Sequence, residues 1–239
     1  MSAERVLVAM SGGVDSSVAA SLLCERGYEV IGVGLRLPEA PKTGATCCGV
    51  AGLRDARRVA AEIGIPFYVL DYQEPFWREV MAPFGRAYTE GRTPNPCIRC
   101  NARLKFGRLL DFARALDAHH LASGHYARVE RREDGTPCLR RGVDSRHDQS
   151  YFLYALTAQQ LAHIIFPLGE LTKGQVREIA RRWDLPVANK PSSQDICFVG
   201  PEGYRVFLAR HYPWALRPGP IVDQEGRELG RHKGIGAYT

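Results

Sequence analysis

The sequence lacks several features that would place the protein outside the class of ordinary globular proteins. No apolar run approaches the roughly 18 residues that a membrane-spanning helix needs, so no membrane association is expected. The few residues before the first apolar run leave no room for a signal peptide, and cytoplasm is the expected location. The seven cysteines are an odd number in a chain without a signal, which argues against a disulfide framework and favours reactive or metal-bound thiols.

Two common nucleotide-binding motifs are also missing from the glycine-containing stretch near the start of the chain. That stretch, residues 11–17, reads Ser-Gly-Gly-Val-Asp-Ser-Ser. It has neither the Gly-Lys-Ser/Thr ending of a Walker A loop nor the Gly-x-Gly-x-x-Gly spacing of a dinucleotide fingerprint. The sequence therefore excludes the two nucleotide-binding classes that these motifs define.

The flanks of this stretch nevertheless predict a phosphate-binding turn. The apolar run Arg5–Met10 before it is typical of a buried parallel strand, and Val18–Cys24 after it is typical of a helix. Two glycines let the backbone turn sharply, and the first amides of a helix point outward to an anion. Ser11, Ser16 and Ser17 add hydroxyl donors, and Asp15 is suited to hold magnesium or to orient a phosphate-bound water. The alternative is an ordinary strand-to-helix turn rich in small residues.

Composition favours a globular fold and an acidic partner. The 239 residues are 45% hydrophobic and 24% charged, with a net charge of +6 and a pI near 9.0. Basic residues gather in three clusters, which make nucleic acid a plausible partner unless each cluster is only a solvated face. The clusters contain Arg103, Lys105, Arg108, Arg128, Arg131, Arg132, Arg140, Arg141, Arg177, Arg181 and Arg182.

The order of predicted elements indicates an α/β fold with an open parallel sheet and helices on both faces. A second strand at Tyr28–Leu35 completes a strand-helix-strand unit, and a helix at Leu53–Ile63 leads to a third strand at Pro66–Leu70. A further strand at His120–Gly124 brings Gly124 to the rim formed by the carboxyl ends of the strands. Leu35 at the same rim is expected to pack on an adenine ring, or else simply in the core.

Two cysteines of the middle region are expected close to the start of a helix. A helical stretch from Glu74 to Tyr88 is expected to be interrupted by Pro83, and an amphipathic helix is expected over Leu104–Leu116. Cys97 and Cys100 would lie just ahead of that second helix, where the dipole favours a thiolate. The adjacent pair Cys47-Cys48 is interpreted as structural, because neighbouring side chains on an extended chain diverge and chelate poorly.

The last part of the chain predicts small mixed units. Residues 127–142 are expected to form a hairpin, and Thr172–Gln175 has the pattern of a capping box that opens a helix through Trp183. A short helix is expected over Tyr204–His211, and a second hairpin turns on Gln224–Gly226. We divide the chain into a nucleotide-binding domain (1–145), a helical extension (146–212) and the start of a β-rich domain (213–239).

Five motifs in order along the chain resemble the tRNA-specific 2-thiouridylase family of the ATP pyrophosphatase superfamily. They lie at Ser11–Ser17, Arg92–Asn101, Gly124–Arg128, Asp148–Leu153 and Ser193–Phe198. The resemblance implies a fold like that of the adenine nucleotide alpha hydrolases. It also implies an enzyme that adenylates the C2 oxygen of the wobble uridine with ATP and then replaces that oxygen with sulfur.

The resemblance also implies roles for individual residues. Cys100 would be the nucleophile and Cys197 would carry a persulfide supplied by a sulfur-donor protein. Residues at the rim would bind ATP with magnesium: Ala9, Met10, Ser11, Gly12, Gly13, Val14, Asp15, Ser16, Leu35 and Gly124. Other residues would meet the tRNA: Asn95, Pro96, Cys97, His125, His147, Asp148 and Gln149.

Two departures from the family pattern leave alternatives open. The family has Asp where this chain has Cys97. Cys97, Cys100 and Cys197 are therefore candidates for holding a 4Fe–4S cluster that binds external sulfide. The alternative is that Cys97 merely replaces the aspartate beside a persulfide pair formed by the other two cysteines. Family members also continue through a β-barrel-like region after the point where this sequence stops, which suggests a fragment or a truncated frame. The competing functions are another AMP-forming enzyme of the superfamily and a non-catalytic nucleotide-binding or RNA-binding fragment.

Overall fold

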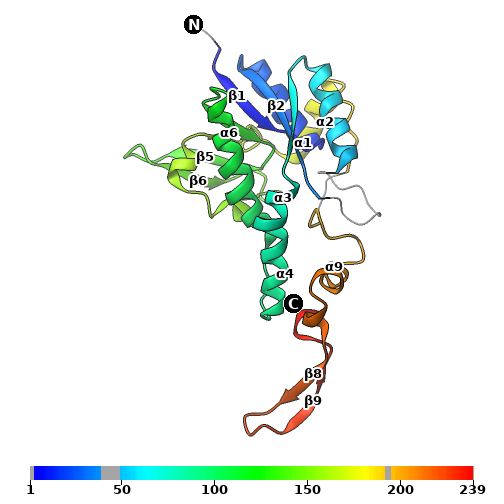
Figure 1. Cartoon of the computed structure of the whole chain (residues 1–239). Helices are drawn as coiled ribbons and strands as arrows, with labels where there is room; N and C mark the ends of the chain where they lie inside the picture. Colours follow the sequence, from blue (N-terminus) through cyan, green and yellow to red (C-terminus); the bar gives the residue numbers. More distant parts are fainter. Residues whose placement is uncertain (1–2, 39–48, 192–194, 239) are drawn as a thin grey trace.

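A five-stranded parallel sheet forms the centre of the protein in the computed structural model, which describes residues 3–38, 49–191 and 195–238 (Figure 1). The strands follow the order β3-β2-β1-β4-β7, and each pairs in parallel with its neighbour. Their bounds are β1 Arg5–Ala9, β2 Glu29–Arg36, β3 Phe67–Asp71, β4 His120–Ser123 and β7 Ile164–Ile165. The predicted open parallel sheet is confirmed, and the carboxyl ends of its strands share one rim.

Helices cover both faces of the sheet, because alternate strand residues point to opposite sides. Val6 and Val8 face a core shared with α1 (Val14–Glu25), α2 (Val50–Glu62) and α8 (Lys173–Arg182). Leu7 faces the other core, to which four helical elements contribute residues. These elements are the π-helical η2 (Cys100–Arg108), α6 (Leu109–Ala115), the 3-10 helix η3 (Ser150–Leu153) and α7 (Ala158–Leu161).

One helical segment continues through the proline that was expected to interrupt it. The segment consists of α3 (Gln73–Phe76), the π-helical η1 (Trp77–Met81) and α4 (Ala82–Thr89). Pro83 lies in the first turn of α4, directly after the π-helical turns. A proline lacks an N–H and crowds the carbonyl one turn earlier, and the wider π turns accommodate both effects without ending the helix. The prediction of an interruption was therefore wrong.

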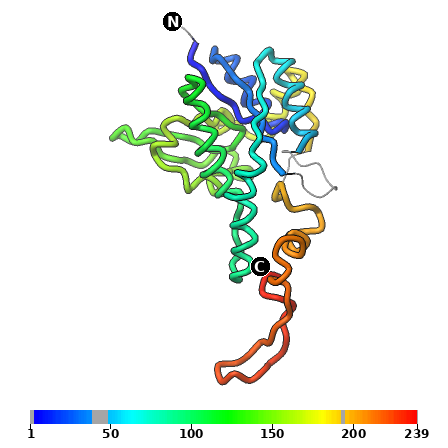
Figure 2. Tube along the Cα trace, viewed as in Figure 1, coloured from blue at the N-terminus to red at the C-terminus, as the bar shows by residue number. Residues whose placement is uncertain are grey.

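A third hydrophobic core lies at the far end of this helical segment. It joins η1 and α4 to α9 (Tyr204–His211) and to the 3-10 helix η4 (Pro213–Leu216), with Phe84, Phe198 and Phe207 packed edge to face. The 3-10 helix η5 (Ile235–Ala237) returns to α4, and the trace between η4 and η5 extends away as the hairpin β8 (Gly219–Val222) and β9 (Glu228–His232) (Figure 2).

Several local predictions are confirmed, and one boundary divides a packed unit. The hairpin β5 (Ala127–Arg131) and β6 (Pro137–Arg141), the helix α9 and the hairpin β8–β9 lie where the sequence predicts them. The expected division at residue 145 separates β7 and α8 from the sheet and from α1, against which they pack. Across the three described ranges, no helix combines the length and apolarity that a membrane span requires.

Candidate functional site

The loop between β1 and α1 is held in a tight turn by a close backbone approach. Gly12 adopts φ +74°, and a Cβ at this position would collide with the carbonyl oxygen of Gly52 in α2. Directly after β4, a Cβ added at Gly124 would lie only 2.6 Å from both the Asp15 carbonyl carbon and the Ser16 amide nitrogen. Gly12 and Gly124 are therefore required by close packing around the loop, whatever else they contact.

The N-terminus of α1 has no side-chain cap, in contrast to α7 and α8. Gly13 is its N-cap residue and supplies no side chain, whereas α7 and α8 each begin with a complete Thr/Gln capping box. The first amides of α1 thus keep their capacity to donate to an external anion, and the helix dipole adds a favourable potential there. This arrangement is suited to the phosphate groups that the sequence predicts.

The three serines of the loop differ in what their hydroxyls do. The Ser16 hydroxyl accepts from the Ser11 amide at 3.2 Å, lies 3.3 Å from the partly exposed Ser11 hydroxyl, and donates to the Gly13 carbonyl oxygen at 3.2 Å. The Ser17 hydroxyl is fully buried and donates to the Gly13 carbonyl oxygen at 2.9 Å. Ser17 therefore stabilises the loop rather than facing a ligand, contrary to the expectation of three ligand donors.

Asp15 is bound by two residues that the sequence analysis did not select. Lys173 Nζ lies 2.6 Å from Oδ1 and 2.7 Å from Oδ2 of Asp15, and the Tyr126 hydroxyl donates to Oδ1 at 2.7 Å. Burial and the nearby Asp15 carboxylate raise the pKa of Tyr126, which keeps its phenol protonated as a donor. A signal for Lys173 existed, because a lysine in the first turn of a helix is disfavoured by the dipole and needs another partner.

A second lysine, Lys190, also contacts the loop, although it lies far along the chain. Lys190 Nζ donates to the Gly12 carbonyl oxygen at 2.9 Å and to Asp55 Oδ2 at 2.5 Å. Two lysines far along the chain therefore converge on one seven-residue loop, and each of them also pairs with a carboxylate.

The predicted cysteines lie inside a helix rather than ahead of it, so that expectation was wrong. Helix α5 (Pro96–Arg99) continues directly into η2, which begins at Cys100. Asn95 is the N-cap residue, and its side-chain oxygen accepts from the Cys97 amide at 3.1 Å. The Asn95-Pro96 pair is a helix start, since asparagine caps well and proline fits the first position. Cys97 is consequently in the first turn, where the dipole still favours a thiolate.

Cys100 and Cys197 pack against the same hydrophobic core, although they are far apart in the sequence. Both are partly exposed, and both pack against the third hydrophobic core, as does Leu35 from the end of β2. Among the described residues, no three side chains of His, Cys, Asp or Glu are close enough together to hold a metal ion. The cysteines placed here do not fit a three-cysteine cluster site. Cys47, Cys48 and the start of the fifth motif (Ser193-Gln194) lie outside the described residues.

Four residues of the predicted tRNA surface have different environments. His147 is exposed, and its Nδ1 lies 2.9 Å from Asp144 Oδ2. Burial and the nearby Lys105 charge hold the pKa of His125 well below its ordinary value of 6.5. Asp148 accepts from the Gly142 and Ser150 amides, and Gln149 accepts from the Tyr126 amide through Oε1. The side chains of Asp148 and Gln149 are thus engaged within the protein.

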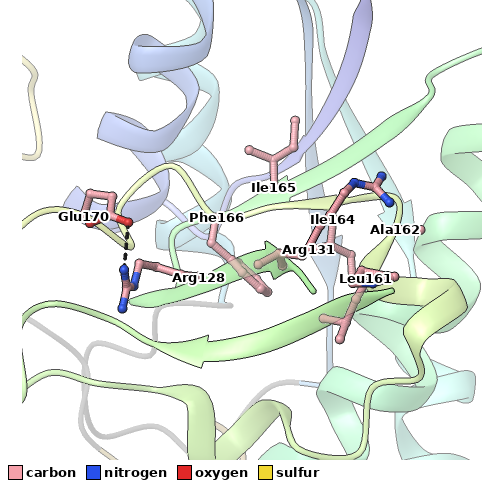
Figure 3. Close-up of a pocket in the computed structure, with 10 residues that line it drawn as sticks. Arg128, Arg131, Leu161, Ala162, Ile164, Ile165, Phe166 and Glu170 are labelled. Atoms are coloured by element: carbon pink, nitrogen blue, oxygen red, sulfur yellow. Dashed lines mark hydrogen bonds and ion pairs between the residues drawn. The ribbon is translucent and has the colours of Figure 1, made fainter. Parts of the chain in front are cut away.

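A hollow of about 320 Å³ lies elsewhere, between the β5–β6 hairpin and residues 161–170 (Figure 3). Arg128 lines it and pairs with Glu170 and Glu130 at 3.2 Å each. None of the predicted site residues lines this hollow, and its arginine is already balanced by carboxylates.

The sheet order, the uncapped α1 and the glycine loop define an α/β protein of the pyrophosphate-loop class. A family model described as "tRNA methyl transferase HUP domain" matches residues 4–201. A "tRNA-specific 2-thiouridylase MnmA" from Magnetococcus marinus is 52% identical to this chain, over 99% of this chain and 67% of the relative. A protein of the same description from Moorella thermoacetica is 54% identical, over 98% of this chain and 67% of the relative. The chain belongs to the tRNA-specific 2-thiouridylase family, and it spans about two thirds of the length of these relatives.

A solved structure with the same fold has little sequence in common with the chain. It is described as a crystal structure of "a 4-thiouridine synthetase - RNA complex with bound ATP". The TM-score is 0.52 at 17% identity, over 84% of this chain and 46% of that one. The likeness supports the predicted fold class alone.

Proposed function

We propose that this protein uses ATP to replace the C2 oxygen of a tRNA uridine with sulfur. One observation of the structure supports the proposal most directly: Cys100 and Cys197, far apart in sequence, pack against the same core together with Leu35 from the strand rim. A site that first activates an oxygen and then displaces it with sulfur needs its thiols beside its nucleotide loop.

Activation of the base is assigned to the loop after β1. The uridine C2 oxygen attacks the α-phosphorus of ATP, the bond between the α and β phosphates breaks, pyrophosphate leaves, and the N3 proton is released. The first amides of α1 and the Lys173 ammonium are the groups that would hold the phosphates. The proposed ATP contacts are those predicted from the sequence: Ala9, Met10, Ser11, Gly12, Gly13, Val14, Asp15, Ser16, Leu35 and Gly124.

Magnesium would enter this site through Asp15. Magnesium in nucleotide sites is held by one or two carboxylates and by the phosphates themselves, so a single carboxylate at the loop fits. The Lys173 ammonium contacts both oxygens of that carboxylate, which marks the position as one that accepts a cation. Magnesium would supply charge neutralisation for the departing pyrophosphate.

Sulfur transfer is assigned to the two cysteines. The terminal sulfur of a Cys197 persulfide, supplied by a sulfur-donor protein, attacks C2 and expels AMP. The Cys100 thiolate then attacks the Cys197 sulfur, which breaks the bond to the transferred sulfur and leaves 2-thiouridine. A disulfide between Cys100 and Cys197 results, and an external thiol reductant restores both thiols.

The tRNA would approach over the segments that carry Asn95–Cys97, His125 and His147. The reacting uridine must leave its stack to reach the loop and the thiols. His147 is exposed, while Asp148 and Gln149 act by shaping the backbone beside it. The exposed cations of the α5–η2 helix add attraction for the phosphate backbone.

Mass spectrometry of tRNA nucleosides tests this proposal. Unmodified tRNA is incubated with the protein, ATP and a small-molecule sulfur source, and 2-thiouridine is quantified. We expect product only with ATP, and none with Cys100→Ser or Cys197→Ser. Cys138→Ser is the matched control, because Cys138 is also partly exposed but lies on the β5–β6 hairpin.

Pyrophosphate release separates this function from its rivals. With Cys100→Ser, tRNA-dependent pyrophosphate release should persist while 2-thiouridine is lost, since only the second step needs the thiol. Pyrophosphate release that is independent of tRNA would instead indicate an adenylating enzyme for another substrate. Thiolation that survives Cys100→Ser would overturn the assignment of the nucleophile.

A further inference from the structure

Two exposed tyrosines form a pair on the 3-10 helix η3. Tyr151 and Tyr154 have 64% and 66% of their surface exposed, although tyrosine is a large, mostly apolar side chain. A 3-10 helix has three residues per turn, so positions three apart lie on one side of it. The ring centroids are accordingly 6.3 Å apart, with an angle of 46° between the rings.

This tyrosine pair is fixed relative to Cys100. Leu153, between the two tyrosines, is 1% exposed and anchors η3 in the second core. The carbonyl oxygen of Phe152 accepts from Nδ2 of Asn101 at 3.0 Å, and Asn101 directly follows Cys100. Asn101 is itself 2% exposed, so this hydrogen bond joins η3 to the cysteine helix inside the protein. The segment that carries the tyrosine pair is therefore held against the helix that carries Cys100.

The polar side chains just before the tyrosine pair form hydrogen bonds within the protein that hold η3 in place. Asp148 accepts from the Gly142 amide at 3.0 Å and from the Ser150 hydroxyl at 2.8 Å. Gln149 Oε1 accepts from the Tyr126 amide at 3.1 Å, and the Gln149 amide donates back to the Tyr126 carbonyl. With these side chains engaged, the groups of this segment that project outward include the tyrosine rings.

The charge beside the pair indicates what kind of partner would cover it. Helices α5 and η2 contact η3, and the stretch of residues 91–110 that contains them has no acidic residue. It has five basic residues: Arg92, Arg99, Arg103, Lys105 and Arg108. Arg92 pairs with Glu90 just before this stretch, and Arg99 Nε donates to the Glu79 carbonyl oxygen at 2.9 Å. Exposed aromatic rings next to cations are the combination that binds single-stranded nucleic acid, in which bases stack and phosphates pair with the cations.

We propose that Tyr151 and Tyr154 form a stacking surface for unpaired bases of the RNA loop that carries the reacting uridine. The proposal deepens the proposed function and rests on it. Unpaired bases expose their flat faces and stack on tyrosine without regard to sequence. The pair would hold the nucleotides that flank the uridine while the uridine itself reaches Cys100.

Binding of fluorescently labelled unmodified tRNA, at one fixed salt concentration, tests the stacking surface. The double variant Tyr151→Ala/Tyr154→Ala should raise the Kd for tRNA by about 10-fold or more, from the typical strength of base stacking. Tyr151→Phe/Tyr154→Phe keeps both rings and should bind like the wild type. Tyr68→Ala is the matched control, because Tyr68 is 53% exposed on β3, away from the cysteine helix.

Three further readouts distinguish stacking from a structural role. In the alanine variant, ATP binding and the thiolation rate at saturating tRNA should equal those of the wild type. The slope of log Kd against log salt should also be unchanged, because stacking releases no counterions. A folding defect would lower all of these together.

The outcomes separate this proposal from the one on which it rests. Wild-type protein that thiolates no tRNA would overturn the proposed function. Wild-type protein that thiolates tRNA, together with an alanine variant that binds tRNA equally well, overturns only the stacking surface. A phenylalanine variant as weak as the alanine variant also overturns it. So does a defect restricted to sulfur delivered by a carrier protein, which would make the pair a protein-docking surface.

Discussion

The Lys173 ammonium is bound to both carboxylate oxygens of Asp15, at 2.6 and 2.7 Å, across the gap between the N-termini of α8 and α1. Both helix N-termini carry partial positive charge, so the lysine lies in an electropositive region and the aspartate compensates it. An incoming phosphate would offer the lysine a second anion. The Lys173–Asp15 ion pair would therefore affect both the conformation of the loop and its affinity for phosphate.

Lys173→Met should weaken both folding and ATP binding. Lys173 is 8% exposed, and among the described residues its loss leaves the Asp15 side chain with the Tyr126 hydroxyl as its remaining partner. We expect the free energy of unfolding to fall by about 1–3 kcal/mol. We also expect ATP affinity to fall about 10- to 100-fold. Denaturant unfolding and ATP titration measure the two effects. Exposed Lys233→Met should change neither, and unaltered ATP affinity in Lys173→Met would remove the lysine from the phosphate site.

Gly124→Ala should disrupt the loop through backbone contact. The added Cβ would lie 2.6 Å from the Asp15 carbonyl carbon and the Ser16 nitrogen, so β4 or the start of α1 must shift. We expect a loss of about 1–3 kcal/mol in stability. The rate of pyrophosphate release should fall by more than the loss of folded protein accounts for, because the displaced groups are those proposed to hold phosphate.

Gly230→Ala is the matched control for that variant. Gly230 lies on β9 with no heavy atom within 4 Å of an added Cβ. Thermal unfolding and ATP titration of both variants provide the comparison. Wild-type ATP binding by Gly124→Ala would mean that the loop tolerates the shift and that its geometry is not critical.

Cys97→Asp should retain thiolation. The helix contact at this position is made by the backbone amide, which donates to Asn95 Oδ1 at 3.1 Å whatever side chain is present. An aspartate in the first helical turn also interacts favourably with the dipole, by about 0.3–1 kcal/mol. Nucleoside mass spectrometry is the measurement, with Cys100→Ser as the inactive reference. Abolished thiolation in Cys97→Asp would show that the third thiol takes part in the reaction.

His125 should make the protein less stable as the pH falls below the ordinary histidine range. Burial lowers the pKa of the folded imidazole, so the unfolded chain takes up a proton near 6.5 while the folded chain does not. The unfolded state then binds more protons, and the free energy of unfolding decreases with decreasing pH. His125→Gln should show a smaller decrease between about pH 7.5 and pH 5.5 in urea unfolding. An identical decrease in both proteins would mean that another group is responsible.

The parts of the fold that depend on short-range patterns were predictable. Apolar runs located the strands, and the Thr172–Gln175 pattern located the start of α8, where both capping hydrogen bonds are present. Turn chemistry located both hairpins. In these cases a few adjacent residues decide the backbone conformation, so the sequence contains the necessary information locally.

The interactions that complete the candidate site were not predictable from local patterns. Lys173 and Lys190 bind the loop from far along the chain, and only the packing of α8 against α1 brings Lys173 there. The early start of the cysteine helix was missed because the amphipathic pattern placed the helix only from Leu104 onward. Asn95 and Pro96 instead form its first turn, with Asn95 as the cap.

The anchoring of the loop by Lys190 has a consequence for the order of folding. The loop itself lies within the first 17 residues, yet its Gly12 carbonyl is secured by a side chain that is synthesised much later. Contacts of such large sequence separation form slowly, since a long chain segment must be ordered before they are made. A nascent chain would therefore display the glycine turn early and acquire nucleotide affinity only after α8 and residue 190 have docked. Tight ATP binding would then indicate that the five-stranded sheet has folded together with α8 and residue 190.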